Sequence, residues 1–348
     1  MVKSNPVLGI IGGGQLGSML SAAAKKLQIK TVVLTDDINA PAKNFCDEII
    51  FSEYGKKDKL LEFAEKVDVI TFEFENIPYE VLSLVSKIKK VLPCPEINKI
   101  IQNREKEKTF VNNLGIKTTS WAHIKSKKDI LENSELLPGL LKTCTLGYDG
   151  KGQVLIKDVK AVKAEFHFTE NYILEKMLKL KKEISVIITR YENGKFSIYE
   201  PIENIHEDQI LKSSKIPANI SKKNYEKSQA ITTLIAEKLK YVGTMCVEFF
   251  IDEKDNLFVN EIAPRVHNSG HLTINAFNIS QFENHIRSVL GLEKKELKKI
   301  KNAEMVNILG KEINDYKNKK FEENEFFFDY LKIKIKEKRK MGHITTLK

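Results

Sequence analysis

The chain has 348 residues, which is long enough for two or three domains with a sizeable core. Its 42% hydrophobic and 30% charged residues are those of an ordinary soluble protein. The formal charge of +10 comes from lysines spread among glutamates and asparagines, so it predicts a solvated surface and argues against a nucleic-acid-binding face.

The cysteines give no sign of a metal site or of a disulfide framework, because Cys46, Cys94, Cys144 and Cys246 are scattered without paired spacing. No stretch approaches the ~18 apolar residues that a membrane-spanning helix needs. The N-terminal residues show no cleavable signal pattern. We therefore expect a reduced, cytoplasmic protein with no membrane partner.

Strand-like and helix-like stretches alternate over residues 1–97, which we predict to be the first domain. Short apolar runs that predict strands lie at 7–11, 31–35, 48–51 and 67–74, and the first is followed by a helical pattern at 15–27. This alternation is typical of a parallel sheet with helices on its faces. Pro93 and Pro95 forbid regular helix and favour a domain boundary just after them.

The remaining chain predicts a larger α/β domain at 98–290 and a small C-terminal domain at 291–348. The larger domain begins with a helical segment from 98 to 115, and we expect a lid subdomain at 118–178. Residues 245–252 and 257–262 predict a hairpin. In the tail, residues 330–336 alternate lysine with apolar residues, which is strand periodicity.

A glycine loop, Gly12–Gly17, satisfies G-x-G-x-x-G between the first strand and the first helix. Asp36 and Asp37 follow at roughly the distance at which dinucleotide-binding folds place a ribose-binding acid. Taken alone, the motif predicts a nicotinamide-dependent oxidoreductase. Such a loop binds any phosphate at a helix N-terminus, so this prediction is kept as an alternative.

Two glutamates of the predicted hairpin point to a metal ion. If Asp252 pairs with Leu257, then Glu248 lies directly opposite Glu261. Opposite side chains have Cβ atoms ~4.5–5.5 Å apart, where like charges are destabilising. A divalent cation removes the conflict, and magnesium suits one or two carboxylates together with phosphate oxygens. An exposed pair that merely tolerates its repulsion is the alternative.

A second glycine loop predicts a phosphate-binding lid. It consists of Gly147, Tyr148, Asp149, Gly150, Lys151, Gly152 and Gln153, and it follows the strand lysine Lys142. Backbone amides of such a loop approach phosphates closely, although an ordinary hairpin turn is the alternative. Together with the magnesium carboxylates, the loop indicates an ATP γ-phosphate held for transfer.

These residues lie in segments that resemble the ATP-grasp superfamily, and within it the 5-(carboxyamino)imidazole ribonucleotide synthase family. The matching segments are GGGQLG (12–17), TFEFENIP (71–78), LGYDGKGQ (146–153), NEIAPRVHNSGH (260–271) and KRKMGHI (338–344). The resemblance implies an α/β fold with a Rossmann-like preATP-grasp domain, a central ATP-grasp domain with a lid and a small C-terminal domain. It also implies a ligase that carboxylates 5-aminoimidazole ribonucleotide with ATP and bicarbonate, through carboxyphosphate, in purine biosynthesis.

The resemblance further implies roles for individual residues. The expected nucleotide ligands are Arg104, Lys142, the loop 147–153, Glu175, Lys176, Met177, Leu178, Glu183, His206, Asn260 and Glu261. Magnesium, or manganese, is expected on Glu248 and Glu261. The residues expected around bicarbonate or carboxyphosphate are Arg265, His267, Asn268 and Ser269. Those expected on the ribonucleotide are Glu73, Glu75, Tyr148, Asp149, Lys151, Lys332 and Arg339.

The expected partners are the small-molecule substrates and a second copy of the chain in a homodimer, with no nucleic acid. A different carboxylating ATP-grasp enzyme, or a formate-dependent transformylase, is the alternative within the class. One departure from the wider superfamily is Ala263, which stands where many ATP-grasp enzymes have asparagine, as it does in the synthase family.

Overall fold

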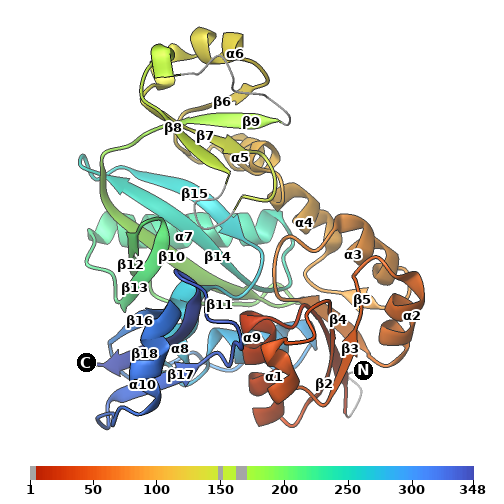
Figure 1. Ribbon diagram of the computed structural model, residues 1–348. Helices are drawn as coiled ribbons and strands as arrows, with labels where there is room; N and C mark the ends of the chain where they lie inside the picture. Colours follow the sequence, from red (N-terminus) through yellow and green to blue (C-terminus); the bar gives the residue numbers. More distant parts are fainter. Residues whose placement is uncertain (1–4, 148–151, 162–170) are drawn as a thin grey trace.

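The computed structural model describes residues 5–147, 152–161 and 171–348 (Figure 1). Its N-terminal part is a five-stranded parallel sheet in the order β3-β2-β1-β4-β5. The strands are β1 Val7–Ile11, β2 Lys30–Thr35, β3 Glu48–Phe51, β4 Val69–Phe72 and β5 Lys90–Val91. The helices are α1 Gln15–Lys26, α2 Lys57–Glu65 and α3 Tyr79–Ser86. The predicted parallel sheet with covering helices is confirmed.

Alternate residues of these strands face two separate cores. Leu8 and Ile10 pack with apolar residues of α1 and of the later helix α9, Gln281–Val289. Ile11 and Val32 pack with α2 and α3 on the opposite face. Burial on both faces explains why the strands are nearly continuous apolar runs.

Two helices lead out of this part, α4 Pro95–Ile101 and α5 Arg104–Asn113. The single helical segment predicted for 98–115 is therefore wrong. The helix restarts because the side chain of Asn103 accepts a hydrogen bond from the backbone amide of Lys106 and caps α5. The new start puts Arg104 in the first turn of α5.

A four-stranded antiparallel sheet in the order β6-β9-β7-β8 lies at the top of Figure 1, above the larger sheet. Its strands are β6 Trp121–Ile124, β7 Gly139–Thr143, β8 Gln153–Ile156 and β9 Tyr172–Lys176. Helix α6, Lys127–Glu132, begins at a capping box formed by Ser126 and Asp129. A small core around Ile124, Leu141 and Leu174 holds the helix to the sheet.

The largest element is a nine-stranded sheet that continues into the C-terminal part of the chain. Its central strands are β10 Leu180–Arg190, β11 Phe196–Ile198, β12 Ile202–Glu207, β13 Ile210–Ile216, β14 Gly243–Asp252 and β15 Leu257–Ala263. Its C-terminal strands are β16 Ala303–Leu309, β17 Glu325–Asp329 and β18 Lys340–Leu347. The remaining helices are α7 Lys222–Lys238, α8 Thr273–Ala276 and α10 Ile313–Lys317. Because β13 pairs with β16, one sheet runs across the expected boundary at residue 290.

The strand predicted for the tail at 330–336 is wrong, since β17 ends at Asp329 and these residues form a loop before β18. Leu331 has a φ of 54°, a left-handed conformation that a strand does not contain. Leu331, Ile333 and Ile335 are exposed, so the alternating pattern has no core to bury against. Among the described residues, no helix combines the length and apolarity that crossing a membrane would require.

Candidate active site

A cavity of about 1250 Å³ is lined by strands of the four-stranded and nine-stranded sheets, by the first turn of α1, by the loop after β4 and by the loops between the sheets. It collects most of the residues expected to bind substrates: Glu73, Glu75, Arg104, Lys142, Gly147, Gln153, Glu175, Lys176, Met177, Leu178, Glu183, His206, Glu248, Asn260, Glu261, Arg265, His267, Asn268, Lys332 and Arg339. Gly152 and Ser269 do not line it. Tyr148, Asp149, Gly150 and Lys151 lie outside the described residues. Residues far apart in sequence thus meet in one cavity.

Glu248 and Glu261 are direct cross-strand partners, as predicted, but the register that produces the pair differs from the prediction. Ile251, not Asp252, pairs with Leu257. Asp252 is the last residue of β14, and its carboxylate accepts hydrogen bonds from the backbone amides of Lys254 and Asn256 in the turn that follows.

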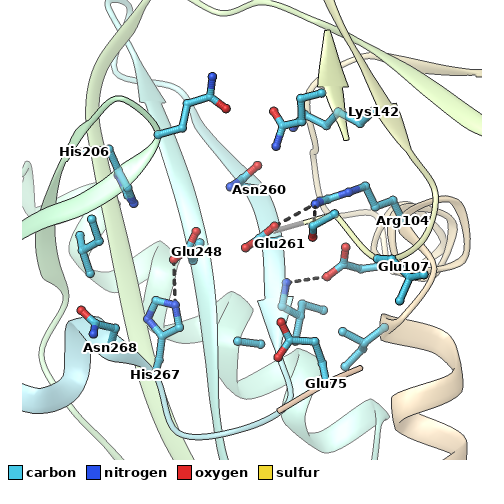
Figure 2. A pocket seen from close by; sticks show the side chains of 18 of the residues that line it. Glu75, Arg104, Glu107, Lys142, His206, Glu248, Asn260, Glu261, His267 and Asn268 are labelled. Carbon is cyan, nitrogen blue, oxygen red and sulfur yellow. Dashed lines mark hydrogen bonds and ion pairs between the residues drawn. The ribbon is translucent and has the colours of Figure 1, made fainter. Parts of the chain in front are cut away.

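A β-bulge then restores the pairing of the two glutamates. Phe249 pairs with Val259 and Glu248 with Glu261, so Asn260 is an extra residue on β15. Successive strand residues normally point to opposite faces. With the bulge, Asn260 and Glu261 both line the cavity, as Figure 2 shows.

The two carboxylates are suited to a divalent cation. Burial, followed by the negative charge of Glu261, raises the pKa of Glu248 to about 7. A bound cation would favour the ionised form and relieve this repulsion. Among residues 5–147, 152–161 and 171–348, no group of three or more His, Cys, Asp or Glu side chains could hold a metal ion. Two carboxylates fit magnesium that takes its other ligands from water and nucleotide phosphates.

This arrangement predicts that stabilisation by magnesium depends on pH. Glu248 has a raised pKa in the folded protein, so its contribution to stability is present at low pH and is lost as the pH rises from about 4.5 through about 7. Magnesium binds the ionised form, so adding it to the protein with ADP should raise Tm more at about pH 8 than at about pH 6. Thermal unfolding of the wild type and of Glu248→Gln checks this, because the variant should lose most of the pH dependence. Equal shifts at both pH values would contradict it.

Helix α5 presents three charged side chains to the site at positions i, i+3 and i+4. Arg104 donates from Nη1 to Oε2 of Glu261 and from Nη2 to the carbonyl of Gly147, both at 3.2 Å. It therefore connects Glu261 to the start of the glycine loop. Glu107, which the sequence analysis missed, lines the cavity and accepts a hydrogen bond from the amide of Ile262 at 2.5 Å. Burial and the charge of Glu261 raise the pKa of Glu107 to about 8.

Lys108 was also missed, and it completes a buried ion triad. The carboxylate of Glu175 on β9 contacts the ammonium groups of both Lys108 and Lys142. The three residues are 3%, 2% and 7% exposed, respectively. Burial raises the pKa of Glu175, but the two lysines outweigh it and hold this pKa well below its ordinary value. Glu107 and Lys108 follow Arg104 by three and four residues, so on a helix they share its face. This spacing could have predicted that both lie near the site.

Part of the cavity lining is apolar, which suits a nucleotide base. Leu140, Leu155 and Phe250 line it together with Met177 and Leu178. Nearby, Nδ1 of His206 lies 2.8 Å from Oε2 of Glu183. Burial lowers the pKa of His206, but the interaction with Glu183 outweighs it and raises the value. A protonated His206 would hold Glu183 in place to accept hydrogen bonds from hydroxyl groups.

The first glycine loop is occupied by a carboxylate of the protein itself. Glu73 accepts hydrogen bonds from the amides of Gly14 at 2.5 Å and Gly17 at 2.6 Å, at the N-terminus of α1. Gly12 has a φ of 101°, and a Cβ there would lie 2.4 Å from Cγ of Glu73. The anion site that would hold a dinucleotide phosphate is therefore filled.

The strand predicted at 67–74 is shorter than expected, because β4 runs only from Val69 to Phe72 and includes neither Glu73 nor Glu75. Both follow it in a loop, where the strict alternation of a strand does not apply. Glu75 binds Arg265 through Nε and through Nη2, the latter at 3.0 Å. The Nη1 group of Arg265 donates to the carbonyl of Val266. Arg265 is thus held by the protein before any substrate binds.

Two residues expected around bicarbonate lie at the floor of the cavity. Nε2 of His267 lies 3.2 Å from Oε1 of Glu248, as the dashed line in Figure 2 marks. Asn268 is held through its side-chain oxygen, which accepts a hydrogen bond from Asn307 on β16 at 2.6 Å. Ser269 is completely buried behind His267, so it has no direct access to substrate.

The tail loop and the start of β18 supply cationic groups to the cavity. Nζ of Lys332 donates to Oε1 of Gln15 at 2.9 Å and to the carbonyl of Lys340 at 2.6 Å. Arg339 donates to the carbonyl of Lys334. Lys340, which was not among the expected residues, also lines the cavity. The loop conformation brings these groups together, although the strand predicted there is absent.

Three family models match the chain in the expected order. A ribonucleotide synthetase preATP-grasp domain matches residues 6–102, an ATP-grasp domain 109–282 and a phosphoribosylaminoimidazole carboxylase C-terminal domain 303–348. The N5-carboxyaminoimidazole ribonucleotide synthase of Bacillus subtilis (strain 168) is 38% identical over 354 residues, covering 100% of this chain and 93% of the relative. The chain belongs to this family. The exact domain boundaries stay a prediction.

Solved structures of the family agree in fold along the whole chain. The Staphylococcus aureus synthetase complexed with ADP is 36% identical with a TM-score of 0.93, covering 100% of this chain and 96% of that one. The Aspergillus clavatus synthase in complex with ADP and 5-aminoimidazole ribonucleotide is 27% identical with a TM-score of 0.89, covering 99% and 94%. The predicted ATP-grasp fold and ligase class are confirmed. The dehydrogenase alternative is wrong, in keeping with the occupied glycine loop.

Proposed function

We propose that this chain uses ATP and bicarbonate to carboxylate the exocyclic amine of 5-aminoimidazole ribonucleotide, with release of ADP and phosphate. The observation that carries the proposal is the shared cavity, which joins an apolar nucleotide slot, a carboxylate pair and a cationic end. Relatives crystallised with ADP, and with ADP and 5-aminoimidazole ribonucleotide together, support it.

In the proposed reaction, an oxygen of bicarbonate attacks the γ-phosphate, ADP leaves, and carboxyphosphate forms. Its carboxyl group is then transferred to the amine and phosphate is released. Magnesium on Glu248 and Glu261 would neutralise phosphate charge during the transfer. Arg104 and Lys142 line the cavity and would bind the phosphates of ATP. Water must be kept away from carboxyphosphate, and the position of the cavity between two sheets and the loops that join them serves this purpose.

Arg265 has a more indirect role in this proposal than the sequence analysis expected. Its guanidinium is already bound to Glu75 and to the carbonyl of Val266. It would therefore stabilise developing negative charge through its electric field and would not need to form a new bidentate bond. His267 and Asn268 are left to contact bicarbonate directly.

Measuring ADP release with different substrates tests the function. The release should depend on 5-aminoimidazole ribonucleotide plus bicarbonate, and glycinamide ribonucleotide plus formate should not replace them. Activity only with formate would assign the chain to a transformylase and contradict the proposal.

Lys332 should contribute to ribonucleotide affinity and not to ATP affinity. Loss of a charge-assisted hydrogen bond costs about 1.5–3 kcal/mol, so Lys332→Ala should raise KM for 5-aminoimidazole ribonucleotide roughly 10–100-fold. The KM for ATP should stay within about twofold. Lys334→Ala is the matched control, because Lys334 is exposed on the same loop and does not line the cavity. Equal increases in both KM values would indicate that Lys332 only supports the loop.

The homodimer and the cytoplasmic location stay predictions. Sedimentation of the purified chain would test the homodimer, and cell fractionation would test the cytoplasmic location.

A further inference from the structure

A chain of buried hydrogen bonds runs from the floor of the cavity into the nine-stranded sheet. Oγ of Ser269 lies 2.8 Å from Nδ1 of His267 and 2.8 Å from Oγ of Ser185. Nδ2 of Asn204 donates to Oγ of Ser185 at 3.0 Å, and Oγ of Ser214 donates to Oδ1 of Asn204 at 2.9 Å. These hydrogen bonds lie inside the protein, because the side chains that extend them from His267 are buried. None of Ser185, Asn204, Ser214 and Ser269 is more than 6% exposed.

The strand register places these hydrogen-bonded side chains next to Glu248, one of the two carboxylates proposed to bind magnesium. Ser185 on β10 is the cross-strand partner of Glu248 on β14, and Asn204 on β12 is the partner of Ser214 on β13. Cross-strand partners share one face of a sheet. The 3-10 helix Asn268–Leu272 covers Ser185 and leaves Glu248 facing the cavity.

The contact between Ser269 and His267 determines which group donates in each hydrogen bond of this series. The backbone N–H of Ser269 can only donate, and it donates to Nδ1 of His267 at 3.4 Å. Nδ1 is therefore an acceptor, and the hydroxyl of Ser269 must donate to it as well. Oγ of Ser269 then accepts from Ser185, and Ser185 accepts from Asn204.

If every hydrogen bond ran in the opposite direction, the side-chain oxygen of Asn204 would face Ser185 and the ring proton of His267 would be on Nδ1. That reversal would set an Nδ1–H group against the backbone N–H of Ser269. Two donors would then face one another in a buried site, which is costly. The thiol of Cys246 also lies beside both serine hydroxyls, but it is a weak hydrogen-bonding group and does not compete with a ring nitrogen.

The ring of His267 has its other nitrogen directed at the carboxylate pair. Because Nδ1 accepts a hydrogen bond, it carries no proton, and the ring is therefore not a doubly protonated imidazolium. A neutral imidazole carries one proton, and Nδ1 is an acceptor here. The proton is therefore on Nε2, 3.2 Å from Oε1 of Glu248.

We propose that Ser185 and Asn204 are positioning residues that act through Ser269 to hold His267 as the Nε2–H tautomer. His267 then acts as a hydrogen-bond donor to Glu248 and to the carboxyl oxygens of bicarbonate or carboxyphosphate, and not as the base that deprotonates them. The identity of this ligand rests on the proposed function, whereas the tautomer rests on the hydrogen bonds alone. A fixed donor needs no reorganisation when negative charge develops on the bound carboxylate.

Nitrogen NMR of the protein labelled with ¹⁵N-histidine tests the tautomer directly. The His267 resonances are assigned by their loss in His267→Gln. In the unsubstituted protein, Nε2 should show the shift of a protonated ring nitrogen and Nδ1 that of an unprotonated one. A protonated Nδ1 would overturn the proposal.

Ser185→Ala tests the positioning role. It removes the donor to Ser269 and leaves only the long 3.4 Å contact from the backbone N–H of Ser269 to oppose an Nδ1–H group, so the two nitrogen shifts of His267 should move toward each other as the second tautomer becomes partly populated. One hydrogen bond contributes about 0.5–1.5 kcal/mol, so kcat should fall roughly 2–10-fold while KM for ATP stays within about twofold. Ser269→Ala removes the next link and should act in the same way, which covers the case in which Ser185→Ala does not fold. Unchanged nitrogen shifts in the folded variant would overturn the role.

Two control variants separate this role from general support of the core. Thr189→Val removes a buried hydroxyl on the same strand, where Oγ1 of Thr189 lies 2.7 Å from Oγ1 of Thr244, away from His267. Ser214→Ala removes the hydroxyl farthest from His267 in the series of hydrogen bonds, and Asn204 can still donate to Ser185. Neither should change the His267 shifts. If the unsubstituted protein were inactive with 5-aminoimidazole ribonucleotide, the proposed function would fall, and the nitrogen shifts would still decide the tautomer.

Discussion

Glu261→Gln should abolish substrate-dependent ADP release while leaving the fold intact. Glutamine keeps the size of the side chain but removes one of the two charges that would hold magnesium, and also the charge that pairs with Arg104. Losing a preorganised electrostatic contact at a phosphoryl-transfer site costs on the order of 10²–10³ in kcat. Steady-state ADP release at saturating ATP and magnesium measures the effect. Removing a carboxylate from a repelling pair should not lower the free energy of unfolding.

Glu253→Gln is the matched control for this prediction. Glu253 lies in the turn of the same hairpin, is exposed and does not line the cavity. Its replacement should leave both turnover and stability unchanged. Normal turnover by Glu261→Gln would refute the metal-binding role of the carboxylate pair. Loss of the folded state would show that Glu261 is needed for structure.

Glu175→Gln should produce the largest loss of stability among the substitutions considered. The substitution leaves two buried ammonium groups, of Lys108 and Lys142, without the carboxylate that contacts them both. Breaking a buried ion pair by removing one partner costs about 3–5 kcal/mol. Urea unfolding without nucleotide measures the change in the free energy of unfolding. Nucleotide is left out because Glu175 is also expected to bind adenine, and binding would add its own stabilisation.

An exposed ion pair provides the control for the buried triad. Glu62 contacts Lys59 at 2.7 Å, and the two side chains are 41% and 42% exposed. Solvent screens such a pair, so Glu62→Gln should change the free energy of unfolding by less than about 0.5 kcal/mol. A comparably small effect of Glu175→Gln would show that one of the buried lysines gives up its proton.

Much of the fold and of the chemistry could be predicted from local patterns. Apolar runs separated by helical patterns were sufficient for the N-terminal parallel sheet, because strands buried on both faces must be apolar throughout. The Glu248–Glu261 pair was predicted from the spacing of a hairpin. The predicted pairing of Asp252 with Leu257 was wrong by one residue, because Asp252 accepts hydrogen bonds from amides of the turn. The bulge at Asn260 compensates for this shift. A local hydrogen bond thus changed the register without changing the pair.

The tail shows where a local pattern fails. Lysine alternates with apolar residues at 330–336, but a period of two predicts a strand only where a neighbouring surface covers the apolar face. Ile333 and Ile335 have no such cover and are exposed. The lysine at position 332 reaches Gln15 on the first helix, a contact between residues 317 positions apart. No local pattern contains that information.

The sequence alone determined the class of fold, the family and the chemical groups that the active site would need, because each depends on short motifs with their own geometry. The tertiary structure decided how those groups are used. It filled the first glycine loop with Glu73, bound Arg265 to Glu75 and placed Ser269 behind His267. These contacts join segments that are distant in the chain or depend on how a loop packs. Their partners are therefore specified by the packing of the whole molecule.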